Sequence, residues 1–319
     1  MNANDCYVRL EPDRHERLHT ELDAWRENCG SPVAIDAAPL APARLDGIDV
    51  LSWNVAIGQG RLDSLLDYLR SSANVGVDEA RPLIILAQEA FRQDDTVPGA
   101  VASLHHGGRL RERERAGIIA VAERAGLSLR YSPSMRNGHH PSDRGNAILA
   151  TVRLSDAHAF LLPYVRQRRV AVTARIAGHP GITFASAHLD THGNSRGNGR
   201  SRSIGAGRSM QAEALAEGLG GDGSVVLGAD LNSVLGLTDP AVRVLVEAGF
   251  HPARREGEWR HTFHGPLRLL LDHVLYRSPD DRIAAVTVTR VDEIAGDRSR
   301  RVFGSDHHPL LARIELNGS

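Results

Sequence analysis

The sequence contains no lysine, and all 38 of its basic residues are arginine. Chemistry that requires a lysine amine is therefore excluded, including Walker A nucleotide binding and Schiff-base catalysis. A phosphate group bound by this protein must be held by arginine, histidine, backbone N–H groups or a metal ion.

Cysteine, aromatic residues and net charge are also scarce. The two cysteines, Cys6 and Cys29, could pair, but nothing requires it, and no zinc-ribbon spacing exists. A formal net charge of -1 gives no overall cationic field, and only 4% of residues are aromatic. Both observations argue mildly against a dedicated nucleic-acid protein, although a local basic patch would suffice.

Long apolar runs are absent. The first residues lack the apolar core of a secretory signal, and no run approaches the length that spans a membrane. We therefore expect a soluble cytoplasmic protein without stable membrane insertion.

Two regions are predicted along the chain. Residues 13–29 have the spacing of an amphipathic helix, with Leu18, Leu22 and Trp25 on one face, and residues 31–44 look like a connector. We assign residues 1–45 to an N-terminal helical extension and connector, and residues 46–319 to a catalytic domain.

Short apolar segments then alternate with a few amphipathic ones. Strands are predicted over 48–56, 81–91, 145–152, 168–177, 181–190, 223–232, 269–277, 283–291 and 308–316. Helices are predicted over 61–70, 109–126 and 239–250, and the segment 201–219 is predicted to end as a helix. Many short strands with few helices favour an α/β sandwich, in which two sheets pack face to face and helices lie outside.

Six of the predicted strands carry polar residues where an apolar run breaks or where the segment meets a loop. These residues are Asn54, Glu89, His188 with Asp190, Asp230 with Asn232, Asp272, and Asp306 with His307. One such residue alone is ordinary strand-end solvation. Together at one edge of the sandwich they would form a strongly negative cluster, whose natural counter-charge is a hard divalent cation bound by oxygen.

Seven short motifs occur in a familiar order: WNV (53–55), QE (88–89), GNAIL (145–149), SAHLD (186–190), GADLN (228–232), LDHVL (271–275) and SDHHP (305–309). This set resembles the endonuclease/exonuclease/phosphatase superfamily over roughly residues 48–316. The resemblance implies a DNase I-like fold, a four-layered α/β/β/α sandwich of two mixed sheets. It also implies a metal-dependent phosphoesterase that uses Mg²⁺, with Mn²⁺ as a possible substitute.

The resemblance also implies metal ligands. Glu89 resembles the main Mg²⁺ ligand, with Asn54 as a metal residue close to it, and Asp306 resembles the second acidic residue near the metal.

The catalytic roles follow from the same resemblance. His307 resembles the histidine that contacts the scissile phosphate, and Asp272 the acid that hydrogen-bonds it. Asp230 resembles the residue that orients and deprotonates the attacking water. Asn232 would bind a phosphate oxygen, and His188 would contribute a second donor or acid.

Substrate contacts are predicted at three further residues. Asn146 of GNAIL would present its amide to a phosphate, and Arg144 could reach the same phosphate. Arg196 lies in a segment rich in glycine, serine and arginine that follows SAHLD, and we predict that this loop contacts substrate. His308 is predicted to be a solvent-facing spacer.

Several functions stay open at this stage. The substrate could be a small phosphorylated molecule or a nucleic acid, and the scissile bond a diester or a monoester. A nuclease of the same superfamily is the first alternative, and a non-catalytic phosphate-binding module is the second. The second alternative predicts loss of Glu89, Asp230 or His307, and all three are present.

Overall fold

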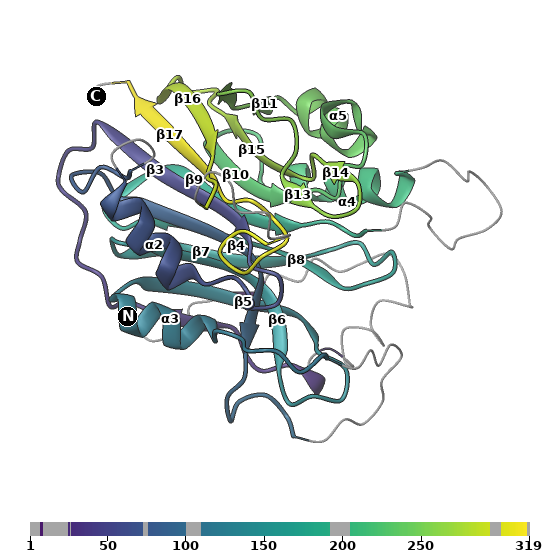
Figure 1. The fold of residues 1–319 in the computed structure, drawn as a ribbon. Helices are drawn as coiled ribbons and strands as arrows, with labels where there is room; N and C mark the ends of the chain where they lie inside the picture. Colours follow the sequence, from purple (N-terminus) through teal and green to yellow (C-terminus); the bar gives the residue numbers. More distant parts are fainter. Residues whose placement is uncertain are drawn as a thin grey trace.

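The computed structural model describes residues 7–8, 25, 27–72, 76–99, 110–191, 205–293 and 301–317. Two β-sheets pack face to face, and helices cover their outer faces (Figure 1). None of the described helices is both long enough and apolar enough to cross a bilayer.

The larger sheet has the strand order β12-β16-β17-β3-β4-β6-β5-β2. Its strands are β2 (Val33–Ile35), β3 (Gly47–Asn54), β4 (Leu83–Arg92), β5 (Ser128–Arg136), β6 (Asp143–Ala150), β12 (Arg254–Glu256), β16 (Ile283–Arg290) and β17 (Leu310–Leu316). The pair β3–β4 is parallel and β4–β6 is antiparallel, so the sheet is mixed.

The smaller sheet has the order β1-β7-β8-β9-β10-β15-β11. Its strands are β1 (Tyr7–Val8), β7 (Leu154–Leu162), β8 (Arg169–Ile176), β9 (His179–His188), β10 (Ser224–Asp230), β11 (His251–Pro252) and β15 (Asp272–Arg277). This sheet is mixed as well, because β9–β10 is parallel and β10–β15 is antiparallel. A separate short hairpin consists of β13 (Phe263–His264) and β14 (Arg268–Leu269).

Three apolar clusters define the layers. One lies between the sheets and includes Val50, Phe184 and Val226. A second joins the outer face of the larger sheet to α2 (Leu62–Ser71) and α3 (Ile118–Ala125), and a third joins the smaller sheet to α4 (Ala206–Gly218) and α5 (Pro240–Glu247). Figure 1 shows the two helix pairs on opposite sides of the molecule. The predicted four-layered α/β/β/α sandwich is therefore confirmed.

The N-terminal region contributes to both sheets. β1 pairs in parallel with β7, and β2 pairs with β5, so each forms an edge strand. The connector predicted over 31–44 thus contains a strand. Trp25, which precedes β2 in the chain, donates its indole N–H to the carbonyl of Pro133 at 3.0 Å and so is attached to β5. Of the helix predicted over 13–29, residues 13–24 and 26 lie outside the described part of the chain, while Trp25, Glu27 and Asn28 are helical.

Two other predictions need correction. Residues 110–116 are not helical, and α3 begins only at Ile118, because the charged run RERER offers no apolar side chain to the core. The strands β5 and β7 were not predicted. β5 contains Pro133, which interrupts the apolar pattern; the structure tolerates it at a register shift between Pro133 and Met135, where the ladder is irregular.

Candidate active site

The register of the smaller sheet aligns three predicted site residues. Asp230, the last residue of β10, lies opposite His188 at the end of parallel strand β9. On its other side Asp230 lies opposite Asp272 at the start of antiparallel strand β15. All three side chains are buried, with exposed fractions of 1–4%. Strand pairing alone therefore places a histidine and two acids in one row.

The larger sheet adds a residue to this row from across the sandwich. β3 ends at Asn54, whose side-chain N–H donates to Oδ2 of Asp230 at 2.8 Å. The sheets can approach closely nearby because Gly228 has no side chain; a Cβ there would lie 2.6 Å from Oγ of Ser52. Gln88 also links the sheets, since its amide donates to Oγ of Ser186 and to the carbonyl of Gly228.

His307 enters the site from the segment that precedes β17. Its Nδ1 lies 2.8 Å from Oδ2 and 3.1 Å from Oδ1 of Asp272, and its Nε2 lies 3.9 Å from Oδ2 of Asp230. The indole of Trp53 donates to the carbonyl oxygen of His307 at 2.8 Å, which fixes the backbone. The imidazole is therefore oriented by Asp272, and its second nitrogen faces Asp230.

Asp272 is itself held by a residue that the sequence did not single out. The hydroxyl of Thr262 accepts hydrogen bonds from the backbone N–H groups of Leu271 and Asp272, both at 3.0 Å. The next residue, Phe263, packs its ring 5.0 Å from the ring of His307. Residues 262–263 thus support both members of the Asp272–His307 pair.

Burial and charge set the protonation of this cluster. Burial, followed by the negative charge of Asp272, raises the pKa of Asp230 to about 7. Burial opposes the charged form of His307, but the charges of Asp272 and Asp230 outweigh it and raise the pKa of His307 to about 10. At neutral pH the site therefore holds an imidazolium beside a carboxyl group poised to gain or lose a proton.

His188 differs from His307. Burial and the nearby positive charges of Arg169 and His307 lower its pKa well below the usual value. The amide of Asn232 donates to Nε2 of His188 at 3.0 Å, which suits a neutral ring. The 3.3 Å contact between His188 and Asp230 is therefore not an ion pair at neutral pH. Asn232 also donates its backbone N–H to Oδ1 of Asp230, which holds that carboxylate in place.

The predicted metal ligand Glu89 occupies an irregular position in β4. Its φ is +53°, and the β4–β6 register shifts between Ala87 and Ala90. Such a bulge turns one side chain out of the regular alternation. Among the described residues, no hydrogen bond or ion pair within 4 Å reaches its half-buried carboxylate, although the positive charges of Arg115 and Arg169 act on it. A strained residue that presents an uncommitted carboxylate fits a Mg²⁺ ligand.

The other two predicted ligands lie on neighbouring segments. Asn54 uses its amide N–H groups on Asp230 and its Oδ1 on the backbone N–H of Ala56. Asp306 is half-buried and precedes His307, and its backbone carbonyl accepts a hydrogen bond from the N–H of His264 at 2.7 Å. A second group of potential metal-binding atoms consists of Asp230, Asp272 and His307, which lie within 4.8 Å of one another. His307 as an imidazolium would not coordinate a cation, so we regard Glu89 as the primary candidate ligand.

The predicted substrate contacts have different outcomes. Arg144, on β6, is half-buried, its charge acts on His188 and Arg169, and its Nε has no hydrogen-bond partner among the described residues. Asn146 is buried, and its amide donates to the carbonyls of Val170 and Ser186 in the other sheet. The amide nitrogen lies 2.7 Å from the first carbonyl oxygen and 3.4 Å from the second, so in this structure Asn146 joins the two sheets. Arg196 lies outside the described residues.

Arg169 lies near the site although no role was predicted for it, and His308 differs from its predicted place. Arg169 is 3% exposed, and the charges of Asp190, Glu89 and Asp230 all act on it. The arginine-rich run before β8 was its only signal in the sequence. His308, predicted to face solvent, is 3% exposed, and its Nδ1 lies 2.8 Å from Oδ1 of Asp292. This prediction is wrong because His308 alternates with His307 along an extended segment and points into the protein on the opposite side.

Comparisons with known structures show the same fold. An endonuclease/exonuclease/phosphatase family protein from Leptotrichia buccalis is 13% identical to this chain. Its TM-score is 0.54, and the match covers 85% of this chain and 99% of that one. Sphingomyelinase C from Streptomyces griseocarneus is 17% identical, with a TM-score of 0.51 over 84% and 99% of the two chains. The 3'-5' exonuclease from Neisseria meningitidis is 18% identical, with a TM-score of 0.51 over 84% and 100%.

The comparison with curated proteins gave no match. The model of the endonuclease/exonuclease/phosphatase family matches residues 51–307, a span that runs from β3 to the catalytic histidine candidate and includes the aligned acids. The chain belongs to the endonuclease/exonuclease/phosphatase family, whose members hydrolyse phosphoester bonds.

Proposed function

We propose that this protein is a Mg²⁺-dependent phosphoesterase that hydrolyses a phosphodiester or phosphomonoester by in-line attack of water. The observation that carries the proposal is the buried group of Asp230, Asp272 and His307, in which one acid has a pKa of about 7 and the histidine a pKa of about 10. Neighbouring groups with such separated pKa values can act as a base and an acid at the same pH.

Asp230 is the proposed general base. Its pKa near neutrality balances the fraction present as carboxylate against basicity, which is the compromise that general-base catalysis requires. Hydrogen bonds from Asn54 and from the backbone of Asn232 hold the carboxylate, so it can accept a proton from a water molecule without reorienting.

His307 is the proposed hydrogen-bond donor to the phosphoryl group. Asp272 accepts from Nδ1 and keeps the ring protonated, so the N–H at Nε2 is available to a phosphoryl oxygen. Charge that develops on this oxygen in the transition state would strengthen the hydrogen bond. The neutral His188 would orient the same substrate group, and Asn232, whose amide donates to His188 and to the carbonyl of Leu189, would hold the His188 ring in place.

Glu89, with Asn54 and Asp306 as further candidates, would hold the metal ion. A bound Mg²⁺ would supply positive charge to phosphate oxygens and lower the cost of the negatively charged transition state. Arg144 and Arg169 add fixed positive charge near Glu89 and His188, as expected where lysine is absent.

The test is hydrolysis of bis-p-nitrophenyl phosphate, p-nitrophenyl phosphate and supercoiled plasmid, each with Mg²⁺, Mn²⁺ or EDTA. We expect EDTA-sensitive release of p-nitrophenol with the plasmid intact. Plasmid nicking would establish the nuclease alternative. Absence of metal-dependent hydrolysis across the panel, with tight phosphate binding, would favour the non-catalytic module and contradict the proposal.

A further inference from the structure

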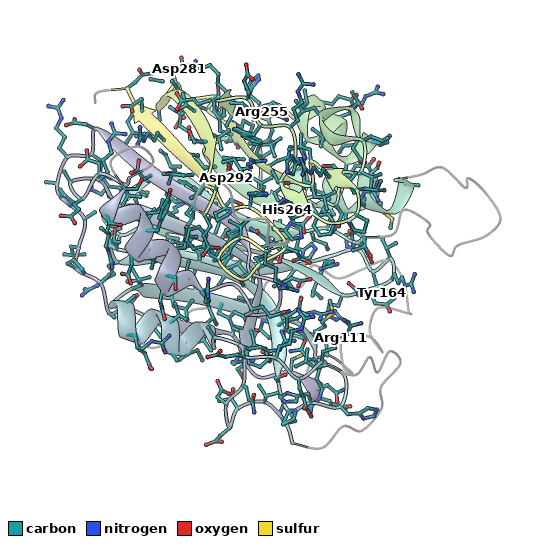
Figure 2. The ribbon with its side chains drawn as sticks, in the orientation of Figure 1. Arg111, Tyr164, Arg255, His264, Asp281 and Asp292 are labelled. Atoms are coloured by element: carbon teal, nitrogen blue, oxygen red, sulfur yellow. The ribbon has the colours of Figure 1, made fainter. Side chains whose placement is uncertain are left out.

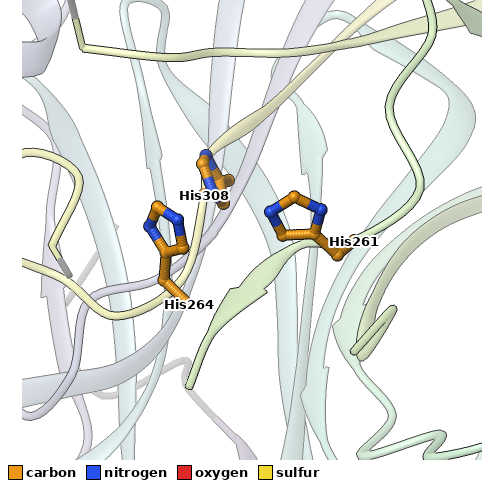
Figure 3. Close-up of side chains that lie close together, drawn as sticks. All are labelled: His261, His264 and His308. Atoms are coloured by element: carbon orange, nitrogen blue, oxygen red, sulfur yellow. The ribbon is translucent and has the colours of Figure 1, made fainter. Parts of the chain in front are cut away.

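A second cluster of imidazoles lies beside the catalytic segment. His261 and His264 flank His308 in Figure 3, and the three potential ligand nitrogens lie within 4.8 Å of one another. His308 follows His307 directly, but the cluster uses none of the residues assigned above to phosphate chemistry. His264 lies on β13 of the short hairpin, and the negative charge of Asp292, which follows β16, acts on it (both are labelled in Figure 2).

The ring geometry matches three ligands around one ion. Ring centroids are 4.8 Å apart for His264–His308, 5.4 Å for His261–His308 and 5.7 Å for His261–His264. Three imidazoles bound tetrahedrally to zinc at about 2.0–2.1 Å would have centroids about 5 Å apart. The interplanar angles of 43–84° also show that the rings are tilted and do not stack in parallel.

Burial provides an independent observation. His308 is 3% exposed, and its Nε2 is buried without a hydrogen-bond partner among the described residues. Its Nδ1 lies 2.8 Å from Asp292 but does not have the geometry of a hydrogen bond. Nδ1 of the half-buried His264 is also buried without a hydrogen-bond partner among the described residues. A buried polar nitrogen without a partner costs free energy, and ring packing alone does not remove that cost. A shared metal ion would satisfy Nε2 of His308 and Nδ1 of His264 at once.

The carboxylate of Asp292 contacts the ring of His308. Oδ1 of Asp292 lies 2.8 Å from Nδ1 of His308, the nitrogen opposite Nε2. The same carboxylate accepts a hydrogen bond from Nη2 of Arg290 at 2.8 Å, through its Oδ2. A carboxylate that contacts the far nitrogen of a histidine is the usual support for a metal-binding imidazole.

The charged neighbours do not favour an anion instead. Arg290 contacts the His261 ring at 3.3 Å, but its Nη2 is paired with Asp292 at 2.8 Å. Each neutral imidazole offers one lone pair, which suits a metal ion. A phosphate site would require donors, whereas a transition metal requires neutral imidazoles.

We propose that His261, His264 and His308 form a binding site for a divalent transition metal, with Zn²⁺ as the expected ion and Asp292 as the support of His308. Imidazole ligands select Zn²⁺, Ni²⁺ or Cu²⁺ over Mg²⁺. Half-buried His261 and His264 give the ion access from solvent, and small ring rotations would bring the nitrogens to coordination distance.

The site would join two segments that converge on the catalytic histidine. The N–H of His264 donates to the carbonyl of Asp306, and the N–H of His308 donates to the carbonyl of Thr262, both at 2.7 Å. An ion shared by His264 and His308 would add a cross-link to this pairing. This role is positional, because none of the three imidazoles lies among the groups proposed to contact substrate.

The experiment uses untagged protein, stripped with a chelator and then kept in excess Mg²⁺ to occupy hard-metal sites. Titration with Zn²⁺ by calorimetry should show one equivalent that Mg²⁺ does not displace, and Zn²⁺ should raise the thermal midpoint. Co²⁺ should give the intense visible absorption of a tetrahedral site. Asp230→Asn should retain the equivalent, which separates this site from the proposed catalytic centre.

Variants of the two half-buried ligands decide the assignment. His261→Asn and His264→Asn should each weaken Zn²⁺ binding at least about 100-fold, and Asp292→Asn about 10–100-fold. His264→Cys should retain binding and add a thiolate-to-cobalt charge-transfer band. His251→Asn, at an exposed histidine of β11, is the matched control and should bind like the wild type.

Two results would overturn the proposal: no retained Zn²⁺ in excess Mg²⁺, or Zn²⁺ binding that His261→Asn and His264→Asn leave unchanged. Binding of inorganic phosphate that depends on these histidines would identify an anion site and would also overturn it. Circular dichroism checks that each variant is folded. Should both asparagine variants unfold, the charge-transfer band of His264→Cys decides, and its absence counts against the site.

Discussion

Replacing Asp272 by asparagine removes the main charge that keeps His307 protonated. The pKa of His307 is raised from 6.5 to about 10, against the effect of burial, chiefly by Asp272 and then by Asp230. Loss of one adjacent carboxylate charge lowers a pKa by roughly 1–3 units. Asparagine has the same shape and can still accept the N–H bond from His307, so the fold should be retained.

The predicted defect depends on pH. The alkaline limb of kcat/KM for bis-p-nitrophenyl phosphate should move from about pH 10 towards neutrality, because the pKa of His307 sets it. If His307 must be protonated, a pKa lowered to about 7–9 should cost roughly 2–100-fold at pH 9, and clearly less at pH 7, where more of the variant stays protonated.

The matched control is Asp49→Asn, since Asp49 is a buried carboxylate near the other end of β3 from Asn54. This variant should leave the alkaline limb in place. An Asp272→Asn enzyme with an unmoved alkaline limb, or with an equal loss at every pH, would refute the proposed role of Asp272.

Further predictions concern the base, the metal ligand and the support of Asp272. Asp230→Asn should lower kcat by roughly 10²–10⁴-fold and abolish the acid limb near pH 7, with the substrate affinity in binding assays nearly unchanged. In the wild type the acid limb of the pH profile should move to lower pH as the Mg²⁺ concentration is raised, because a nearby cation favours the carboxylate form of Asp230. An acid limb that does not depend on Mg²⁺ concentration would count against a metal ion near Asp230. Glu89→Gln should raise the Mg²⁺ concentration for half-maximal rate at least about tenfold, and unchanged metal dependence would exclude Glu89 as the main ligand. Thr262→Val leaves the N–H groups of Leu271 and Asp272 without their acceptor and should lower the free energy of unfolding by about 1–3 kcal/mol in urea titrations, together with kcat.

The sequence predicts the fold and much of the candidate site for a simple physical reason. Buried strands are continuous apolar runs, so a polar residue such as Asp230 or Asp272 at the end of a run is conspicuous. The sandwich then needs only correct strand pairing to align them. The two mixed sheets and the Asp230–Asp272 alignment follow from that pairing.

Other features depend on details that periodicity does not carry. The bulge at Glu89 needs a positive φ in a residue that seldom adopts one, and local sequence gives no sign of it. The bonding of Asn146 depends on where the second sheet lies, so a motif that looks ready for phosphate instead joins two backbones. The edge strands β1 and β2 are too short to show a period.

The cluster of His261, His264 and His308 could not be predicted from the sequence either. His261 and His264 lie more than forty residues before His308, and only the hairpin at Phe263 and His264 brings them together, through its bridge to His307. Without that pairing, His308 is a polar residue in a polar stretch, and solvent exposure is the natural expectation. Tertiary contact, and not local sequence, determines its burial.

The central claim is that water attacks phosphorus at the site built by Asp230, Asp272 and His307. The most direct measurement is hydrolysis of bis-p-nitrophenyl phosphate in water enriched in oxygen-18, with Mg²⁺, followed by mass spectrometry of the product. The account predicts one solvent oxygen in the product phosphate from the wild type, formed at a rate that Asp230→Asn lowers by orders of magnitude and Asp49→Asn does not. Solvent oxygen found in p-nitrophenol, or an unchanged rate in Asp230→Asn, would contradict it.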